Sequence, residues 1–160
     1  MAKMFEASEL LQVAVDDEKS GVALYQTLAE VTSNADLKLF FAGLAEQERG
    51  HQKRFEQLLQ QVGDYKSPDA YADEYLRYVQ ALTTDRAFPD EATAVRKARD
   101  CGGDEAAFDL ALRFERDTLV LLHEMKGMVA EKDQPVIAEI ISEEQQHVVD
   151  LTAAREKLKG

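Results

Sequence analysis

Two Glu-x-x-His motifs are the part of this sequence best suited to chemistry. In an α-helix, residues three apart lie on one face, so a carboxylate oxygen and an imidazole nitrogen of one motif can reach the same ion. The two motifs are Glu48-Arg49-Gly50-His51 and Glu144-Gln145-Gln146-His147. Each motif is therefore a candidate pair of metal ligands.

Two further glutamates precede the motifs at nearly equal distances. Glu48 follows Glu18 by 30 residues, and Glu144 follows Glu115 by 29 residues. Each half of the sequence thus supplies one lone glutamate and one Glu-x-x-His motif. This matched spacing indicates two similar halves related by a pseudo-two-fold axis.

Each of these four glutamates occupies a position where the apolar stripe of its helix should continue. Steps of three or four residues lead from Val15 through Glu18 to Val22, for example. Because the chain has 31 acidic residues, any single glutamate could instead lie on a solvated helix face. Carboxylates inside an apolar core, however, are costly and repel one another unless cations neutralise them. Two divalent metal ions would supply the four positive charges required.

The resulting prediction is a two-metal site. Its ligands are Glu18, Glu48, His51, Glu115, Glu144 and His147. Oxygen and nitrogen ligands suit iron or manganese, and zinc stays open. Cys101 is the only cysteine, which excludes sulfur-ligated iron or zinc within the chain. His123 follows Glu115 by eight residues, about 80° around a helix, so we expect it on the surface or in packing.

The elements that must position these residues are helices. Prolines are few, alternating β-branched runs are absent, and residues of good helix propensity form long stretches, so the class is all-α. The first helix is expected from about Ser8 to the cluster at 32–34, and the second from an N-cap at Asp36 to Gly63. The short link between them predicts antiparallel neighbours.

A second hairpin is expected in the other half of the chain. The third long helix should begin at Asp104, and the fourth after the turn at 132–135, with Pro135 in its first turn. Residues 63–104 form a crossover with two short helices, opened at 67–69 and 88–90. Two helical hairpins joined by one long crossover make a ferritin-like four-helix bundle, which we expect to be a single domain over residues 1–160.

The composition narrows the choice of partners. The formal net charge of −12 would repel nucleic acid and anionic membrane surfaces. The sequence shows neither a signal peptide nor a stretch long and apolar enough to span a membrane, which predicts a cytoplasmic protein.

Over essentially its whole length, the chain resembles the ferritin-like superfamily and, within it, the rubrerythrin-like proteins. The two motifs and the two lone glutamates match the ligand set of that family, whose bundles hold two iron or manganese ions. Tyr25, seven residues after Glu18, matches a tyrosine near the metals in rubrerythrins, although it would also fit an ordinary core position. The resemblance further implies that Glu48 and Glu144 bridge the ions, with Glu18 and Glu115 as terminal ligands.

The activity that the resemblance implies is reduction of peroxide or oxygen at a di-iron centre, with peroxide detoxification in particular. Two departures from the family bear on it. Rubrerythrins carry an additional glutamate that exchanges with a histidine as iron changes oxidation state, and Thr118 stands at that place here. Full-length rubrerythrins also have a small Cys-ligated iron domain that delivers electrons, so this chain would need an external electron donor.

Two other functions stay open at the level of sequence. A ferroxidase or iron-handling protein would oxidise many ferrous ions per chain and store or transfer the iron. A non-catalytic interaction module would use its metals only to brace the bundle. Exchange of hairpins between two chains would permit a homodimer.

Overall fold

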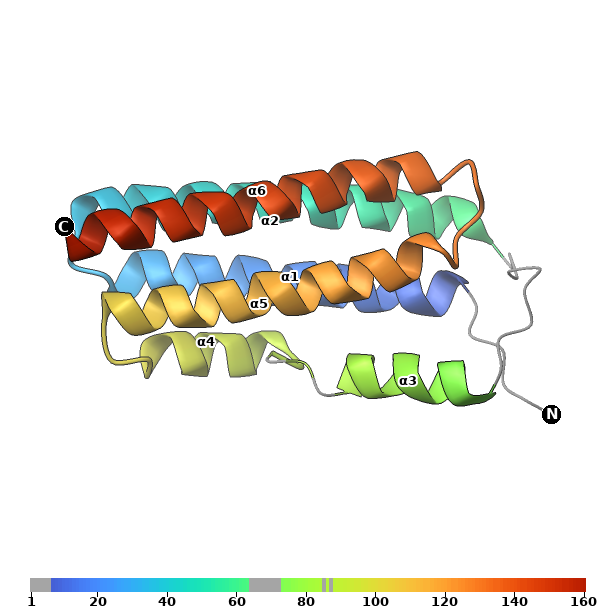
Figure 1. Ribbon diagram of the computed structural model, residues 1–160, viewed down its shortest axis with the longest axis horizontal. Helices are drawn as coiled ribbons and strands as arrows, with labels where there is room; N and C mark the ends of the chain where they lie inside the picture. The colour runs from blue at the N-terminus through green and yellow to red at the C-terminus, as the bar shows by residue number, and fades with distance from the viewer. Residues whose placement is uncertain (1–6, 64–72, 85, 87) are drawn as a thin grey trace.

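The computed structural model describes residues 7–63, 73–84, 86 and 88–160, and the regular secondary structure of these residues is entirely helical. The helices are α1 (Ala7–Val31), α2 (Ala35–Val62), α3 (Asp73–Thr84), α4 (Glu91–Arg99), α5 (Asp104–Lys126) and α6 (Gln134–Lys159). The four long helices α1, α2, α5 and α6 lie side by side, and the crossover helices lie along one side of the bundle, with α3 against α5 and α4 mainly against α1 (Figure 1). The predicted all-α bundle of two hairpins is confirmed. None of the helices in these ranges is long and apolar enough to cross a membrane.

The turn between α1 and α2 corrects one detail of the prediction. Asn34, and not Asp36, is the N-cap of α2: its backbone is extended, and its side chain accepts hydrogen bonds from the backbone N–H groups of Asp36 and Leu37 at 3.0 and 3.1 Å. Asp36 lies in the first turn, where its charge is favourable next to the positive end of the helix dipole. At the other end α2 stops at Gly63, as predicted, in a conformation with φ of 53° that glycine accepts readily.

The starts of the helices α4, α5 and α6 lie close to the residues predicted from capping residues and proline. Asp90 caps α4 by accepting from the backbone N–H of Thr93 at 2.7 Å. Helix α5 begins at Asp104 and α6 begins with proline in its first turn. The expected opening of the first short helix at 67–69 lies outside the described residues, and the first crossover helix that is described begins at Asp73.

Two apolar clusters fill the interior of the bundle, and every long helix contributes to both. One cluster includes Leu28, Phe41 and Phe108, and the other includes Leu11, Phe55 and Ile137, among others. On each long helix the predicted ligands lie between the residues of one cluster and those of the other. The fold therefore places a polar layer midway along a bundle that is apolar on both sides of it.

Candidate metal centre

The polar layer consists of the six residues that the sequence singled out. They are Glu18 on α1, Glu48 and His51 on α2, Glu115 on α5, and Glu144 and His147 on α6, and each is at most 1% exposed. Their ligand atoms form two groups, in each of which the atoms lie within 4.8 Å of one another. The His51 group also contains Glu18, and the His147 group also contains Glu115, whereas Glu48 and Glu144 belong to both.

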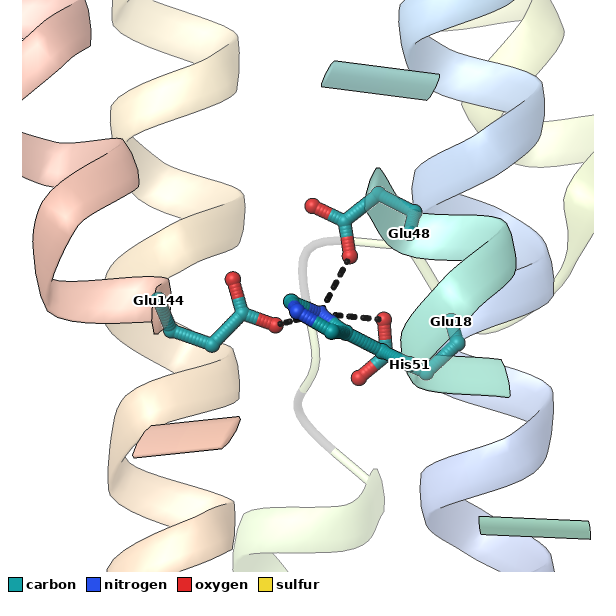
Figure 2. Close-up of side chains that lie close together, drawn as sticks. All are labelled: Glu18, Glu48, His51 and Glu144. Carbon is teal, nitrogen blue, oxygen red and sulfur yellow. Dashed lines mark ion pairs between the residues drawn. The ribbon is translucent and has the colours of Figure 1, made fainter. Parts of the chain in front are cut away.

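In the His51 group three carboxylates converge on one imidazole nitrogen, and Glu144 reaches it from the opposite hairpin (Figure 2). His51 Nδ1 lies 2.7 Å from Glu144 Oε1, 3.4 Å from Glu48 Oε2 and 3.8 Å from Glu18 Oε2. Ligands that hold one ion at about 2.0–2.2 Å and at right angles are themselves roughly 3 Å apart. The separations in this group are therefore close to those of ligands sharing one ion.

The His147 group repeats this arrangement with the other oxygens of the shared carboxylates. His147 Nδ1 lies 2.7 Å from Glu144 Oε2, 3.2 Å from Glu48 Oε1 and 3.4 Å from Glu115 Oε1. Glu48 and Glu144 thus each present one oxygen to each histidine. The two imidazole rings are stacked with centroids 5.5 Å apart.

Unpartnered polar atoms gather at this centre. Among the described residues, every buried side-chain nitrogen or oxygen without a hydrogen-bond partner belongs to these six side chains. Both oxygens of Glu18, Glu48 and Glu144 are in this condition, and so is Nδ1 of each histidine. Each unmet buried group costs about 1–3 kcal/mol. A donor set of carboxylates and imidazoles, with so many atoms unmet, fits two divalent cations and gives a candidate two-metal site.

The electrostatics of the side chains alone point the same way. Burial, followed by the charges of Glu48 and Glu144, raises the pKa of Glu18 and of Glu115 well above its ordinary value. Burial would also raise the pKa of Glu48, but the adjacent imidazoles of His147 and His51 hold it below its ordinary range. The surrounding carboxylates overcome the effect of burial on the imidazoles and raise the pKa of His147 to about 12. Such a cluster binds protons or metal cations, and metal binding would release protons.

The outer nitrogen of each histidine contacts a residue that the sequence analysis did not identify. His51 Nε2 lies 2.8 Å from an oxygen of Glu143, and His147 Nε2 lies 2.9 Å from Gln47 Oε1. With Nε2–H donating to these acceptors, Nδ1 faces the carboxylates, and once its proton is released its lone pair is available to a metal ion. Each acceptor immediately precedes the glutamate of the opposite motif, which is the signal that could have identified them.

Tyr25 contacts the centre from α1. Its hydroxyl donates a hydrogen bond to Glu115 Oε1, and its ring is fully buried against Phe41 and Phe114. Burial, then the negative charge of Glu115, raises the pKa of the Tyr25 phenol well above its ordinary value. The phenol is therefore a neutral donor to one oxygen of Glu115, whose other oxygen is unmet.

A second buried contact engages Thr118. Its hydroxyl donates to Asp17 Oδ2 at 2.7 Å, and Arg86 Nη1 lies 3.2 Å from Asp17 Oδ1. Burial raises the pKa of Asp17 to about 6, although Thr118 and Arg86 both act to lower it. The sequence analysis did not identify Asp17, because helical periodicity assigned only its neighbour Glu18 to the interior. His123 is exposed and belongs to neither ligand group.

Comparison with known proteins agrees with this geometry. A family model described as rubrerythrin matches residues 9–155. The fold is similar to the crystal structure of a protein described as a ferritin-like diiron-carboxylate protein from Thermotoga maritima, with a TM-score of 0.70 and 26% sequence identity over 98% of each chain. No curated protein sequence matches significantly.

Proposed function

The chain belongs to the rubrerythrin family, and on that premise we propose that it is a non-haem di-iron oxidoreductase that reduces peroxide or oxygen. The observation that carries the proposal is the set of buried nitrogen and oxygen atoms in the polar layer that have no hydrogen-bond partner. They are confined to two interlocking groups, and each group combines carboxylates with one imidazole. Iron and manganese both suit such a donor set, and the family favours iron.

The proposed roles of the six residues follow from the two groups. Glu18 and His51 would hold one ion, Glu115 and His147 would hold the other, and Glu48 with Glu144 would be shared. Two ferrous ions bound there would supply the two electrons that reduction of peroxide to water requires. The four carboxylates balance the four positive charges, so the loaded layer is close to neutral inside an apolar bundle.

The surrounding residues keep this layer in place. The apolar clusters on both sides exclude water, so the charges of the ligands interact in a region of low dielectric constant. The same packing keeps the ligand side chains in fixed positions. The Tyr25 hydroxyl occupies one oxygen of Glu115 and leaves the other oxygen for an ion. The Thr118 hydroxyl donates to Asp17, so it is not directed at the metal positions. This supports a fixed set of six ligands, without the additional exchanging glutamate of rubrerythrins. Electrons would come from an external donor.

The test is to load the protein with ferrous ion without oxygen, count the iron per chain, and follow its absorption after mixing with peroxide or with oxygen. We expect two ions per chain, oxidised faster by peroxide. Oxidation mainly by oxygen, with continued turnover of added ferrous ion, would indicate iron handling, which the net charge of −12 would assist by attracting cations. Bound iron inert to both would indicate a non-catalytic module.

Glu48→Ala and Glu144→Ala are the informative variants, because each removes a shared carboxylate. Both should bind fewer ions than the wild-type protein. Glu46→Ala is the matched control, since Glu46 lies on α2 with its side chain 70% exposed. Less than one iron per chain, unchanged in the two variants, would show that the ligand assignment is wrong.

A further inference from the structure

The Nε2 atoms of the two histidines contact residues at equivalent positions of the opposite hairpins, but one of these residues is charged and the other is neutral. Glu143 on α6 accepts from His51 of the other hairpin, and Gln47 on α2 accepts from His147. We propose that this difference makes the two metal positions unequal, with the His51 position binding a ferrous ion more tightly and filling first. The inference rests on the ligand set in the proposed function.

The Glu143 side chain is fixed on both of its oxygens. Arg54 donates to Oε1 at 3.1 Å and to Oε2 at 2.6 Å, and Oε2 also lies 2.8 Å from His51 Nε2. An arginine that donates to both oxygens holds a carboxylate in a defined orientation. The side chains of Glu143 and Arg54 are 39% and 28% exposed, so this ion pair lies at the edge of the bundle and not in its core. His51 thus donates to a charged, oriented acceptor.

The acceptor behind His147 is a neutral amide. Gln47 is exposed, and its Oε1 lies 2.9 Å from His147 Nε2. Hydrogen bonds to ionised acceptors are roughly twice as strong as those between neutral groups. A carboxylate behind a metal-binding imidazole also raises the basicity of that imidazole as a ligand. By this argument His51 is the stronger ligand of the two.

A second, independent difference acts in the same direction. Glu115, the lone carboxylate of the His147 group, accepts a hydrogen bond from the buried Tyr25 hydroxyl, which withdraws charge from the ligand. Glu18, its counterpart in the His51 group, has both oxygens free of hydrogen bonds. Glu48 and Glu144 are common to both positions and favour neither. The His51 position thus has the more basic imidazole and the more fully charged carboxylate.

The test isolates each position by removing the lone glutamate of the other. Glu115→Gln should leave the His51 position, and Glu18→Gln should leave the His147 position. Ferrous ion is titrated into each variant without oxygen, and bound iron is measured by equilibrium dialysis. Because loss of an outer contact to a ligand typically costs 10–100-fold in metal affinity, we expect the Glu115→Gln protein to bind its single ion about tenfold more tightly.

The outer residue is then changed in both backgrounds. Glu143→Gln should weaken binding about tenfold in the Glu115→Gln protein, while the Glu18→Gln protein should change by less than about twofold. Gln47→Glu should strengthen binding in the Glu18→Gln protein. A general structural role for Glu143 would shift both backgrounds alike, and circular dichroism checks that each variant is folded.

The outcomes separate this inference from the proposed function. Two ions per wild-type chain, with equal affinities that do not respond to Glu143→Gln, would overturn the inference and leave the ligand set intact. Equal effects of Glu143→Gln in both backgrounds would also overturn it. Less than one ion per chain, unchanged by Glu18→Gln or Glu115→Gln, would instead overturn the proposed function.

Discussion

At the scale of single residues, Tyr25 provides the hydrogen-bond partner for one buried carboxylate oxygen of the centre. Its hydroxyl donates a hydrogen bond to Glu115, and both side chains are fully buried. If the hydroxyl were removed, water could not easily reach Glu115 to take its place. Loss of the hydroxyl would leave Oε1 of Glu115 unmet in addition to Oε2, which already lacks a partner. The effect of Tyr25 should therefore be visible in stability before any chemistry is considered.

We expect Tyr25→Phe to lower the free energy of unfolding of the metal-free protein by about 1–3 kcal/mol, the cost of one unmet buried acceptor. Urea denaturation followed by circular dichroism measures this change. Tyr78→Phe is the matched control: the Tyr78 side chain is exposed, and its hydroxyl contacts Glu124 at 3.3 Å on the surface. That change should stay within about 0.5 kcal/mol. Equal stability of Tyr25→Phe and the wild-type protein would contradict the role given to the hydroxyl.

Thr118 has an equally specific contact, with the buried carboxylate of Asp17. Thr118→Val preserves shape but removes the donor, so we expect a loss of about 1–3 kcal/mol in the free energy of unfolding. Thr118→Ser keeps the hydroxyl and should lose less, although a methyl group is removed. Denaturant titrations of the two variants provide the comparison. A Thr118→Val protein as stable as the Thr118→Ser protein would show that the hydrogen bond to Asp17 contributes little.

At the scale of elements, helical periodicity explains why the sequence allowed so much to be predicted. Once the helices were phased by their apolar residues, the inward positions of Glu18 and Glu144 followed from steps of three and four. Contacts between helices do not follow in this way. Glu143 lies next to an inward residue on α6, yet its partner His51 is on α2, and only the rotation and spacing of the two hairpins bring them together.

The turns show the same limit on a smaller scale. Both Asn34 and Asp36 are good N-cap residues by type, and the choice between them depends on which backbone is extended. Asp17 was missed for a related reason. Its buried carboxylate is paired with the hydroxyl of Thr118 and the guanidinium of Arg86, which belong to segments far away in the sequence, so the pairing could not be predicted from the sequence around Asp17.

Close packing of α1 against α5 and α2 depends on a glycine. A Cβ atom at Gly21 would lie 2.6 Å from Cζ of Phe114 and 3.4 Å from Cγ of Glu48. The ring of Phe114 cannot move freely, because it packs edge-on against Tyr25 and tilted against Phe88. An added methyl group at this place must therefore displace the ring or separate the helices.

We expect Gly21→Ala to be destabilising. Overpacking typically costs about 1–3 kcal/mol, whereas the better helix propensity of alanine contributes at most about 1 kcal/mol. Gly43→Ala is the matched control on α2: its Cβ would meet open space, so the change should stabilise the protein by about 0.5–1 kcal/mol. Thermal unfolding followed by circular dichroism distinguishes the two. A rise in the midpoint for both variants would contradict the tight approach at Gly21.

At the scale of the whole molecule, the centre requires both hairpins. The hairpin of α1 and α2 supplies Glu18, Glu48 and His51, and the hairpin of α5 and α6 supplies the other three. Neither ligand group is complete within one hairpin, since Glu144 is needed in the first and Glu48 in the second. An ion in either position would thus add a further link between two halves that already contact each other through apolar packing and through polar pairs such as Tyr25 with Glu115 and Thr118 with Asp17.

Metal binding should therefore stabilise the whole bundle and not one hairpin. A ligand present at 100 times its dissociation constant adds about 2.7 kcal/mol per site when it binds only the folded state. For a chain of this size each kcal/mol raises the midpoint of thermal unfolding by about 2–4 °C. We expect ferrous ion, added without oxygen, to raise the midpoint by several degrees within one cooperative transition, and a chelator to reverse the rise. Glu144→Ala removes a ligand from both positions and should lose most of the rise, whereas Glu46→Ala should keep it. A rise of equal size in the Glu144→Ala protein would place the bound iron elsewhere, and two separate transitions would show that the hairpins unfold independently.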